Sequence, residues 1–386
     1  MPTYGERTLT FVRGEGAYLF DANGRRFLDF GAGIAVTSIG HSNPVMVKAL
    51  QEQAATVLHT SNLYLIPGQI KAAERLCANS FAEVVFFGNS GAEANEGLIK
   101  LIRKYQAYNG HPERYRIVTV EGAFHGRTLA TIAAGGSKKH LEGFGPVVDG
   151  FDQVPFGNMN ALRNAITKET AGVLIEPIQG EGGIRPMDLE YIREVRKACD
   201  EFGILMGLDE VQCGIGRTGK LFAYEWAGIE PDVMSLAKGL GGGVPVGAVL
   251  ATKKAAAGMV AGTHGSTYGG NPLSTAAVNA VLDVILADGF LAHVQDVAAY
   301  LREKAEALAA KHPGVFKGVR GAGLMLGLVA VPPNGEVVAA ATKNGLLTVP
   351  AGDNVVRLLP PLTVSKAEVD EAMAILEKTA AAMAAA

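Results

Sequence analysis

The sequence has few cysteines, a single tryptophan and little net charge. Its 386 residues include three cysteines and carry a formal net charge of −3. Cys77, Cys199 and Cys213 are odd in number and have no metal-like spacing, which argues against a secreted disulfide framework and for a reducing compartment. A pI of about 6.3 gives no sign of the basic surface that binds nucleic acid.

Long apolar runs are also missing. Residues 1–16 carry four charged side chains and lack the apolar segment of a signal peptide. Polar residues interrupt the uncharged stretch 255–282, so it does not resemble a membrane span. We therefore expect a cytoplasmic protein with neither membrane nor nucleic-acid partners.

Apolar residues and glycine are abundant instead. Hydrophobic residues make up 48% of the chain, the opposite of a disordered composition, and the length suggests two to three domains. The 49 glycines are about twice the usual share. They lie in short groups between apolar runs, as expected where the backbone approaches a ligand closely.

Short apolar runs alternate with helical patterns through the first two thirds of the chain. The runs are continuous, as in strands buried on both faces, and charged residues mark one side of each helix. This alternation predicts an α/β fold with a mostly parallel sheet. We expect strands at 84–87, 117–120, 172–175, 204–208, 233–236 and 247–251, and helices at 92–108 and 189–202.

After residue 273 the pattern changes to that of a smaller α+β domain. We expect helices at 273–286 and 291–311, strands at 323–329 and 355–359, and a last helix from 366 that ends in the Ala-rich tail 380–386. A hairpin with strands at 17–21 and 26–30 is expected to join this domain. The predicted division is 1–45 for the N-terminal segment of the small domain, 46–287 for the large domain and 288–386 for the rest of the small domain.

Three groups of residues mark a candidate site. Ser90, Gly91 and Ala92 stand where a strand ends and a helix begins, a natural place for a phosphate because backbone N–H groups are free there. Asp209 ends a second strand, and Lys238 follows a third, where a desolvated amine acts as a nucleophile. The ordinary alternatives are a Ser-capped turn, a solvated acidic loop and a surface lysine.

A near match to a nucleotide-binding loop suggests a different class of protein. Residues 214–221 fit the first seven positions of the Walker A pattern, but Leu221 replaces the Ser or Thr that would hold Mg²⁺. Glycines 239–243 likewise lack the spacing of a dinucleotide fingerprint. An ATPase or nucleotide-binding regulatory module is kept as the alternative.

One ligand would use the phosphate cradle, the acid, the lysine and Arg127 together. Pyridoxal phosphate has a phosphate, a ring nitrogen that prefers a neighbouring anion, and an aldehyde that reacts with a lysine. This cofactor is therefore expected, and no metal site is.

The motifs around these residues resemble the class III (ω-amino acid) aminotransferases of the type I pyridoxal-phosphate fold, and within them the acetylornithine group. The most specific are LDEVQCGIGRTGKLFAYE at 208–225, PDVMSLAKGLGGGVPVGA at 231–248 and HGSTYGGNPL at 264–273. The resemblance implies a large domain with a mostly parallel sheet and a small domain formed by both termini. It also implies a homodimer with the site at the subunit interface.

The resemblance implies roles around the cofactor. Lys238 would form the Schiff base and move the proton, and Asp209 would keep the ring nitrogen protonated. Gln212 would bind the ring hydroxyl, and Phe124 would stack on the ring. The phosphate contacts would be Ser90, Gly91, Ala92 and, from the neighbouring subunit, Thr267.

Two arginines would recognise the substrates. By resemblance, Arg357 takes the α-carboxylate of glutamate or 2-oxoglutarate, and Arg127 takes the distal carboxylate, which in the donor is its own α-carboxylate. Glu181 would neutralise Arg357 when the donor presents an ω-amine, and Ser266 would also contact the substrate. The implied ping-pong reaction moves the ω-amino group of N-acetylornithine to 2-oxoglutarate. The alternatives are an aminomutase or an ω-aminotransferase for 4-aminobutyrate, succinylornithine, ornithine or a lysine-pathway carrier.

Four features depart from the family pattern. Asn43 stands where relatives often have histidine, and Cys213 replaces a common threonine near the cofactor. Residues 65–68 diverge in the segment that tends to line the substrate entrance. A tyrosine that ornithine-specific relatives carry near Ile34 is absent, which favours an acylated donor.

Overall fold

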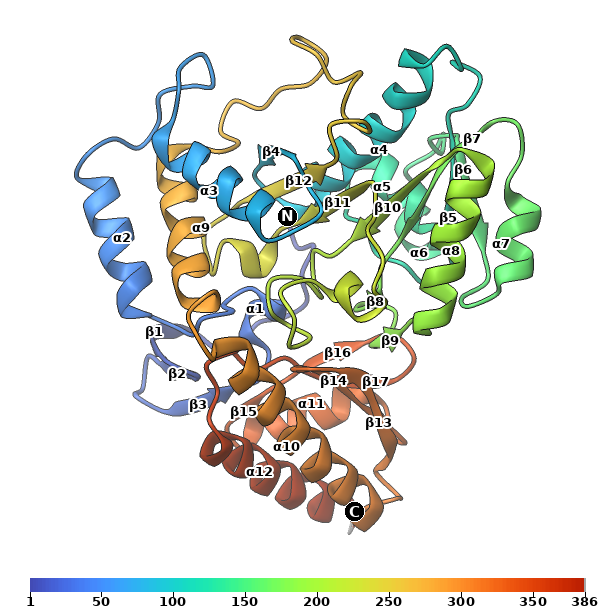
Figure 1. Cartoon of the computed structure of the whole chain (residues 1–386). Coiled ribbons are helices and arrows are strands. Elements are labelled where there is room, and N and C mark those ends of the chain that lie inside the picture. The colour runs from blue at the N-terminus through green and yellow to red at the C-terminus, as the bar shows by residue number, and fades with distance from the viewer. Residues whose placement is uncertain (385–386) are drawn as a thin grey trace.

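A seven-stranded sheet forms the centre of the larger part of the molecule in the computed structural model, which describes residues 1–384 (Figure 1). Six of its strands were expected from the sequence, and their bounds agree to within two residues. In spatial order the strands are β4 (Val84–Gly88), β12 (Gly247–Ala251), β11 (Val233–Leu236), β10 (Leu205–Asp209), β7 (Thr170–Ile175), β5 (Arg116–Val120) and β6 (Phe151–Val154).

The sheet is mostly parallel, as predicted. Strands β11, β10, β7, β5 and β6 pair in parallel, whereas β12 runs antiparallel to both of its neighbours, β4 and β11. The carboxyl ends of β4, β7, β10 and β11 therefore meet along one edge of the sheet, which is where open α/β sheets bind ligands.

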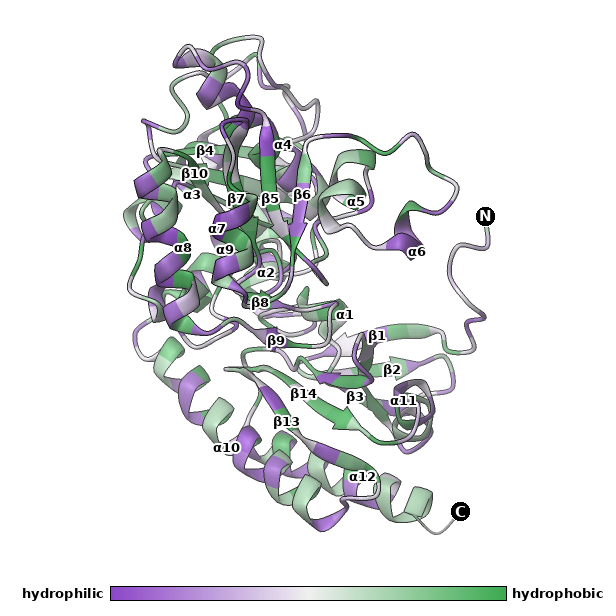
Figure 2. Cartoon of the chain, turned by 90° about the vertical axis from the view of Figure 1, so that its right-hand side faces the viewer, coloured by the Kyte–Doolittle hydropathy of each residue, from purple (hydrophilic) through white to green (hydrophobic). Residues whose placement is uncertain are grey.

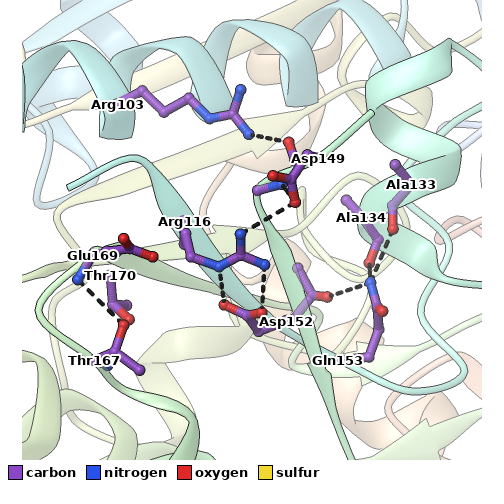
Figure 3. A network of polar contacts seen from close by, with 12 residues as sticks. Arg103, Arg116, Ala133, Ala134, Asp149, Asp152, Gln153, Thr167, Glu169 and Thr170 are labelled. Atoms are coloured by element: carbon purple, nitrogen blue, oxygen red, sulfur yellow. Dashed lines mark hydrogen bonds and ion pairs between the residues drawn. The ribbon is translucent and has the colours of Figure 1, made fainter. Parts of the chain in front are cut away.

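Strand β6 was missed because half of its residues are polar. Asp152 pairs with Arg116 on β5 through two hydrogen bonds of 2.9 and 2.7 Å, and the Gln153 amide donates to Ala133 O at 2.9 Å (Figure 3). The second contact holds α5 (Leu129–Gly135) against this edge. Arg127 precedes α5 by two residues, so the edge strand also fixes a residue of the candidate site.

Helices cover the sheet and begin with capping residues. The side chain of Ser90 caps α4 (Gly91–Tyr108), and that of Asp188 caps α8 (Leu189–Phe202). Asn43, a departure from the family pattern, caps α2 (Pro44–Ala54) by accepting Val45 N–H at 3.0 Å. The remaining helices of this part are α3 (Pro67–Ala78), α6 (Lys138–Leu141), α7 (Met159–Ala165) and α9 (Pro272–Ile285), with short 3₁₀ turns at Ala223–Trp226 and Lys238–Leu240.

The C-terminal part has its own antiparallel sheet, in the order β13 (Phe316–Ala322), β14 (Met325–Ala330), β17 (Val355–Leu358) and β16 (Val349–Ala351). The expected single strand at 323–329 was partly wrong, because Gly323 and Leu324 form the turn of a hairpin. Strand β13 has too many Gly, Lys and Arg residues to show an apolar pattern. Helix α10 (Phe290–Lys311) packs on β13 and lies beside α12 (Lys366–Ala384) (Figure 2). Helix α11 (Asn334–Lys343) packs against β16 and β17.

No single helix within residues 1–384 is long and apolar enough to cross a membrane. Helices α9 and α10 would together be long and apolar enough, but their axes are bent by 72° relative to each other. The expected helical tail at 380–386 is helical as far as Ala384, and residues 385–386 lie outside the described residues.

The N-terminal residues pair with the C-terminal part of the chain. The expected hairpin consists of β2 (Tyr18–Asp21) and β3 (Arg26–Asp29), and an unexpected strand, β1 (Phe11–Glu15), extends it. Strand β3 pairs in parallel with β15 (Leu346–Leu347), so the N-terminal hairpin joins the C-terminal region, as expected. The domain boundaries at 45 and 287 stay a prediction.

The packing of the sheet predicts the outcome of one substitution. A Cβ atom at Gly172 on β7 would lie 2.6 Å from the carbonyl oxygen of Leu205 and 2.8 Å from the Ile102 side chain. We expect Gly172→Ala to lower the free energy of unfolding by about 1–3 kcal/mol because the core cannot accept the methyl group. Gly335→Ala is the control, since its Cβ meets nothing on α11. Urea unfolding measures both, and equal stabilities would contradict the packing argument.

Candidate active site

A cavity of about 420 Å³ opens at the carboxyl edge of the central sheet. It brings together nine of the twelve residues named from the sequence, although they come from segments up to about 150 residues apart. The nine are Ser90, Gly91, Ala92, Phe124, Arg127, Glu181, Asp209, Gln212 and Lys238. The three that do not line this cavity are Ser266, Thr267 and Arg357.

Arg357 on β17 still reaches the site through its neighbours. Its guanidinium donates to both carboxylate oxygens of Glu181, at 2.6 and 3.2 Å, and to Gln212 Oε1 at 3.3 Å. Ser266 and Thr267 instead line a separate cavity of about 400 Å³, where the Asn89 amide donates to Ser266 Oγ at 3.2 Å. A single chain therefore does not bring these two residues into the main cavity.

The N-terminus of α4 fits a phosphate. The first N–H groups of a helix have no acceptor within the helix, and Gly91 and Ala92, which begin α4, line the cavity. A Cβ at Gly91 would lie 2.8 Å from Val211, and one at Gly126 would lie 2.8 Å from Ala92, so side chains are excluded from the cradle. Ser90 also caps the helix by accepting Glu93 N–H at 3.2 Å, as its ordinary alternative predicted.

Asp209 at the end of β10 is buried and accepts three hydrogen bonds. Val211 N–H donates to Oδ1 at 3.0 Å, while the Asn95 amide and the His125 ring contact Oδ2 at 2.7 and 2.8 Å. These three donors offset the cost of burying the carboxyl group. Burial alone would lower the pKa of His125, but its hydrogen bond to Asp209 and the charge of that carboxylate raise it instead.

Two residues of this hydrogen-bond network, Asn95 and His125, were not among the site residues predicted from the sequence. Asn95 lies inside α4, and its Oδ1 accepts the Ser235 hydroxyl from β11 at 2.6 Å. His125 sits between Phe124 and Gly126 in the loop after β5. The sequence carried one weak signal for each: a polar residue on an otherwise buried helix face, and a histidine beside a predicted ring-stacking phenylalanine.

Lys238 begins the 3₁₀ turn that follows β11, and its backbone has φ +43°, in the left-handed region. Such strain in a non-glycine residue is typical of functional positions. Burial lowers the pKa of Lys238, although the charge of Glu181 opposes this. The shift favours the uncharged amine that a nucleophile needs.

Arg127 and Phe124 lie at the open side of the cavity. The Arg127 guanidinium is exposed, stands 5.4 Å from the centre of the Phe124 ring, and has no ion-pair partner within residues 1–384. Arg357, in contrast, is buried and paired. Although burial alone would raise the pKa of Glu181, the hydrogen bonds and charge of Arg357 hold it below its ordinary value. One arginine is thus free to bind an anion, and the other is already neutralised.

The near Walker A segment has a different geometry from a nucleotide-binding loop. Residues 211–222 form consecutive turns rather than a link from a strand to a helix. Arg217 is fully buried and donates to Leu324 O and Pro360 O of the C-terminal part, and burial lowers its pKa to about 9. Lys220 Nζ donates to Glu225 O at 3.1 Å. Both cations have structural partners, so the ATPase alternative loses its geometric basis.

The cysteines and possible metal ligands add no further chemistry. All three cysteines are free, and burial raises the pKa of the Cys213 thiol, which fits a small apolar residue better than a reactive one. Among the described residues, no cluster of three or more His, Cys, Asp or Glu side chains is arranged to hold a metal ion.

Comparison with known proteins identifies close relatives. The family model described as aminotransferase class-III matches residues 2–380. An acetylornithine aminotransferase from Brucella melitensis is 58% identical over 375 residues, which cover 97% of this chain and 93% of that protein. One from Rhodobacter capsulatus is 54% identical over 383 residues, which cover 99% and 98%.

Solved structures confirm the predicted fold class. The ornithine aminotransferase from Toxoplasma gondii has a TM-score of 0.95 at 29% identity, with 99% of this chain and 92% of that chain covered. A second structure of that protein contains pyridoxal phosphate at partial occupancy in its active site. The N-acetylornithine aminotransferase from Stenotrophomonas maltophilia has a TM-score of 0.86 at 38% identity, with 98% and 97% covered.

A buried acid next to Asp209 predicts the pH dependence of stability. Burial raises the pKa of Glu210 to about 8, against an ordinary value near 4.5. The folded protein therefore binds this proton between about pH 5 and 8 when the unfolded chain does not, and the free energy of unfolding falls as pH rises through that window.

Replacement of Glu210 by glutamine tests this dependence. We expect Glu210→Gln to give a shallower decline of unfolding free energy between pH 5 and 8 than the wild type. Urea unfolding at four pH values measures the slopes, with Glu303→Gln on the exposed side of α10 as the control. Identical slopes for wild type and Glu210→Gln would contradict the assignment.

Proposed function

The chain belongs to the class III aminotransferases, which use pyridoxal phosphate, and from this premise we propose that it transfers the ω-amino group of N-acetylornithine to 2-oxoglutarate. The products are N-acetylglutamate semialdehyde and glutamate. The observation that carries the proposal is the contrast between two arginines at one cavity, Arg127 open and Arg357 paired with Glu181. The acetylornithine aminotransferases named above, at 54–58% identity, support the choice of donor.

The cavity fits the cofactor group by group. Pyridoxal phosphate, when bound, supplies an aldehyde and a cationic ring that withdraws electrons from the substrate carbon. The α4 N-terminus would hold its phosphate, and Phe124 would lie against one ring face. Asp209, held in place by its three donors, would keep the proton on the ring nitrogen, and Gln212 would bind the ring hydroxyl.

Lys238 performs the covalent and proton-transfer steps in this proposal. Its uncharged Nζ would hold the cofactor through the aldehyde carbon, with loss of water, until the donor amine takes its place. The freed Nζ would then be the base that carries a proton between the substrate and the cofactor. An aminomutase would use the same residues, but its turnover would need no external keto acid.

The two arginines explain how one cavity serves two substrates. Arg127 binds the α-carboxylate of the acylated donor, whose other end carries an amine and no carboxylate. Glu181 meanwhile neutralises Arg357 through the bidentate pair. Glutamate and 2-oxoglutarate bring a second carboxylate, which takes the place of Glu181 on Arg357.

Ornithine is the second candidate donor. The high TM-scores to ornithine aminotransferases favour it, although at 29% identity. Transfer from free ornithine would place its charged α-amine near the exposed Arg127, which is unfavourable by like-charge repulsion. The acylated donor avoids this repulsion.

We also propose a homodimer that completes the site. Ser266 and Thr267 lie away from the main cavity within one chain, at a surface where apolar side chains are exposed. Leu63, Leu65 and Tyr268 expose between 62 and 86% of their area, so large apolar side chains are uncovered on a single chain. A second copy would cover them. The cytoplasm is the proposed compartment, consistent with three free thiols.

Loss of the lysine amine tests the chemistry. We expect purified wild-type protein to absorb in the visible range, borohydride to fix the cofactor on Lys238, and Lys238→Ala to lose transfer by more than about a thousandfold. Lys220→Ala is the control, since Lys220 contacts only a carbonyl and the Trp226 ring. A colourless wild-type protein that stays inactive with added cofactor would overturn the proposal.

A panel of donors tests the substrate. With 2-oxoglutarate as acceptor, we expect N-acetylornithine to have the highest kcat/KM among N-acetylornithine, succinylornithine, ornithine and 4-aminobutyrate. Glu181→Gln should lower kcat/KM for N-acetylornithine about tenfold or more, because the positive charge of Arg357 is then unpaired. The same variant should lose less with glutamate. A panel in which 4-aminobutyrate or ornithine matches N-acetylornithine would contradict the choice of donor.

A further inference from the structure

Glu176 is a buried acid at the cavity that the proposed chemistry leaves without a role. It directly follows β7 at the carboxyl edge of the sheet, is 4% exposed and lines the main cavity. Burial, together with the negative charge of Asp209, raises its pKa to about 7, against the opposing charge of His125. An unpaired carboxyl at such a position is costly to keep. Its contacts therefore identify what it does.

Both carboxylate oxygens of Glu176 accept backbone N–H groups from two different loops. Oε1 accepts Phe124 N–H at 2.8 Å, and Oε2 accepts Gly180 N–H at 3.3 Å. Phe124 is the residue expected against the cofactor ring. Gly180 immediately precedes Glu181, which covers Arg357. One side chain thus contacts the backbone of both walls.

The two loops also touch each other directly. The Gln179 amide donates to Glu121 O at 3.0 Å, and a Cβ at Gly182 would lie 2.5 Å from Gly122 O. A Cβ at Gly180 would lie 2.3 Å from Gln212 Oε1. The backbones of the two loops are therefore in close contact, and the Gln212 side chain lies against the Gly180 loop.

A role in proton transfer fits Glu176 less well than a role in positioning. Each of its oxygens already accepts a backbone N–H, and Lys238 supplies the mobile proton in the proposed reaction. Glu210 shows what the same arrangement does elsewhere. It is equally buried and accepts Ala223 and Tyr224 N–H at 2.7 and 2.8 Å, but it does not line the cavity. There the carboxylate only holds a turn.

We propose that Glu176 is a positioning residue that holds the Phe124 loop and the Gly180–Glu181 loop together, so that cofactor binding and the choice of carboxylate are coupled. The part of this proposal that concerns the choice of carboxylate rests on the proposed function, in which Glu181 neutralises Arg357 until a substrate carboxylate takes its place. The part concerning Phe124 requires only that pyridoxal phosphate binds.

Glu176→Gln is the main test, because it preserves size but replaces one acceptor with a donor facing a buried N–H. The holoprotein is dialysed against a series of pyridoxal phosphate concentrations to give the cofactor Kd. The value of kcat/KM is then measured separately with N-acetylornithine and with glutamate as the amino donor. We expect the Kd to rise about tenfold. The ratio of kcat/KM for N-acetylornithine to that for glutamate should fall at least threefold, since a loosened Glu181 is displaced from Arg357 more easily.

Glu210→Gln is the matched control, and Glu176→Asp is the second variant should glutamine prevent folding. Glu210→Gln should lower Tm but leave Kd and the ratio within about twofold of wild type. Aspartate is too short to reach both loops, so Glu176→Asp should raise Kd or lower the ratio.

Two results would overturn the positioning role. One is a Glu176→Gln protein that loses only Tm, as the control does. The other is loss of turnover with Kd and ratio unchanged, which would indicate acid–base chemistry. If wild type does not use N-acetylornithine, the proposed donor fails, while the Kd comparison still decides whether Glu176 positions Phe124.

Discussion

The hydrogen bonds that fix the buried Asp209 carboxylate are the interactions on which the rest of the site depends. Its partners come from helix α4, the loop after β5 and the turn after β10, and Ser235 on β11 supports one of them. A single carboxyl group therefore ties together the elements that carry the proposed phosphate cradle, the proposed ring-stacking phenylalanine and the proposed nucleophilic lysine. Their relative positions are set before any ligand binds, which is the preorganisation that an electrostatic site requires.

The proposed substrate recognition depends in turn on the contact between the two parts of the chain. Arg357 belongs to the C-terminal sheet, but its carboxylate partner Glu181 comes from the large part. The buried Arg217 makes a second connection from the loop after β10 to two carbonyls of the C-terminal part. A buried guanidinium with only carbonyl partners is costly to move, so it keeps this interface closed behind the site.

Much of this arrangement could be predicted from the sequence because it depends on local patterns. Continuous apolar runs located six of the seven central strands, and the small residues at 90–92 located the helix start. Strand β6 was missed because half of its residues are polar, and strand β13 because its Gly, Lys and Arg residues hide any apolar pattern. The roles of Asn95, His125 and Glu176 could not be predicted either. Each acts through a partner that is between 30 and 114 residues away, and no local periodicity records such contacts.

The protonation state of the cofactor ring tests the account most directly, because Asp209 is the residue proposed to keep the ring nitrogen protonated. ¹⁵N NMR of the holoprotein carrying pyridoxal phosphate labelled at the ring nitrogen reports that state. The account predicts the chemical shift of a protonated nitrogen throughout pH 6 to 9, and its loss in Asp209→Asn. A ring nitrogen that is unprotonated at pH 7 in the wild-type protein would contradict it.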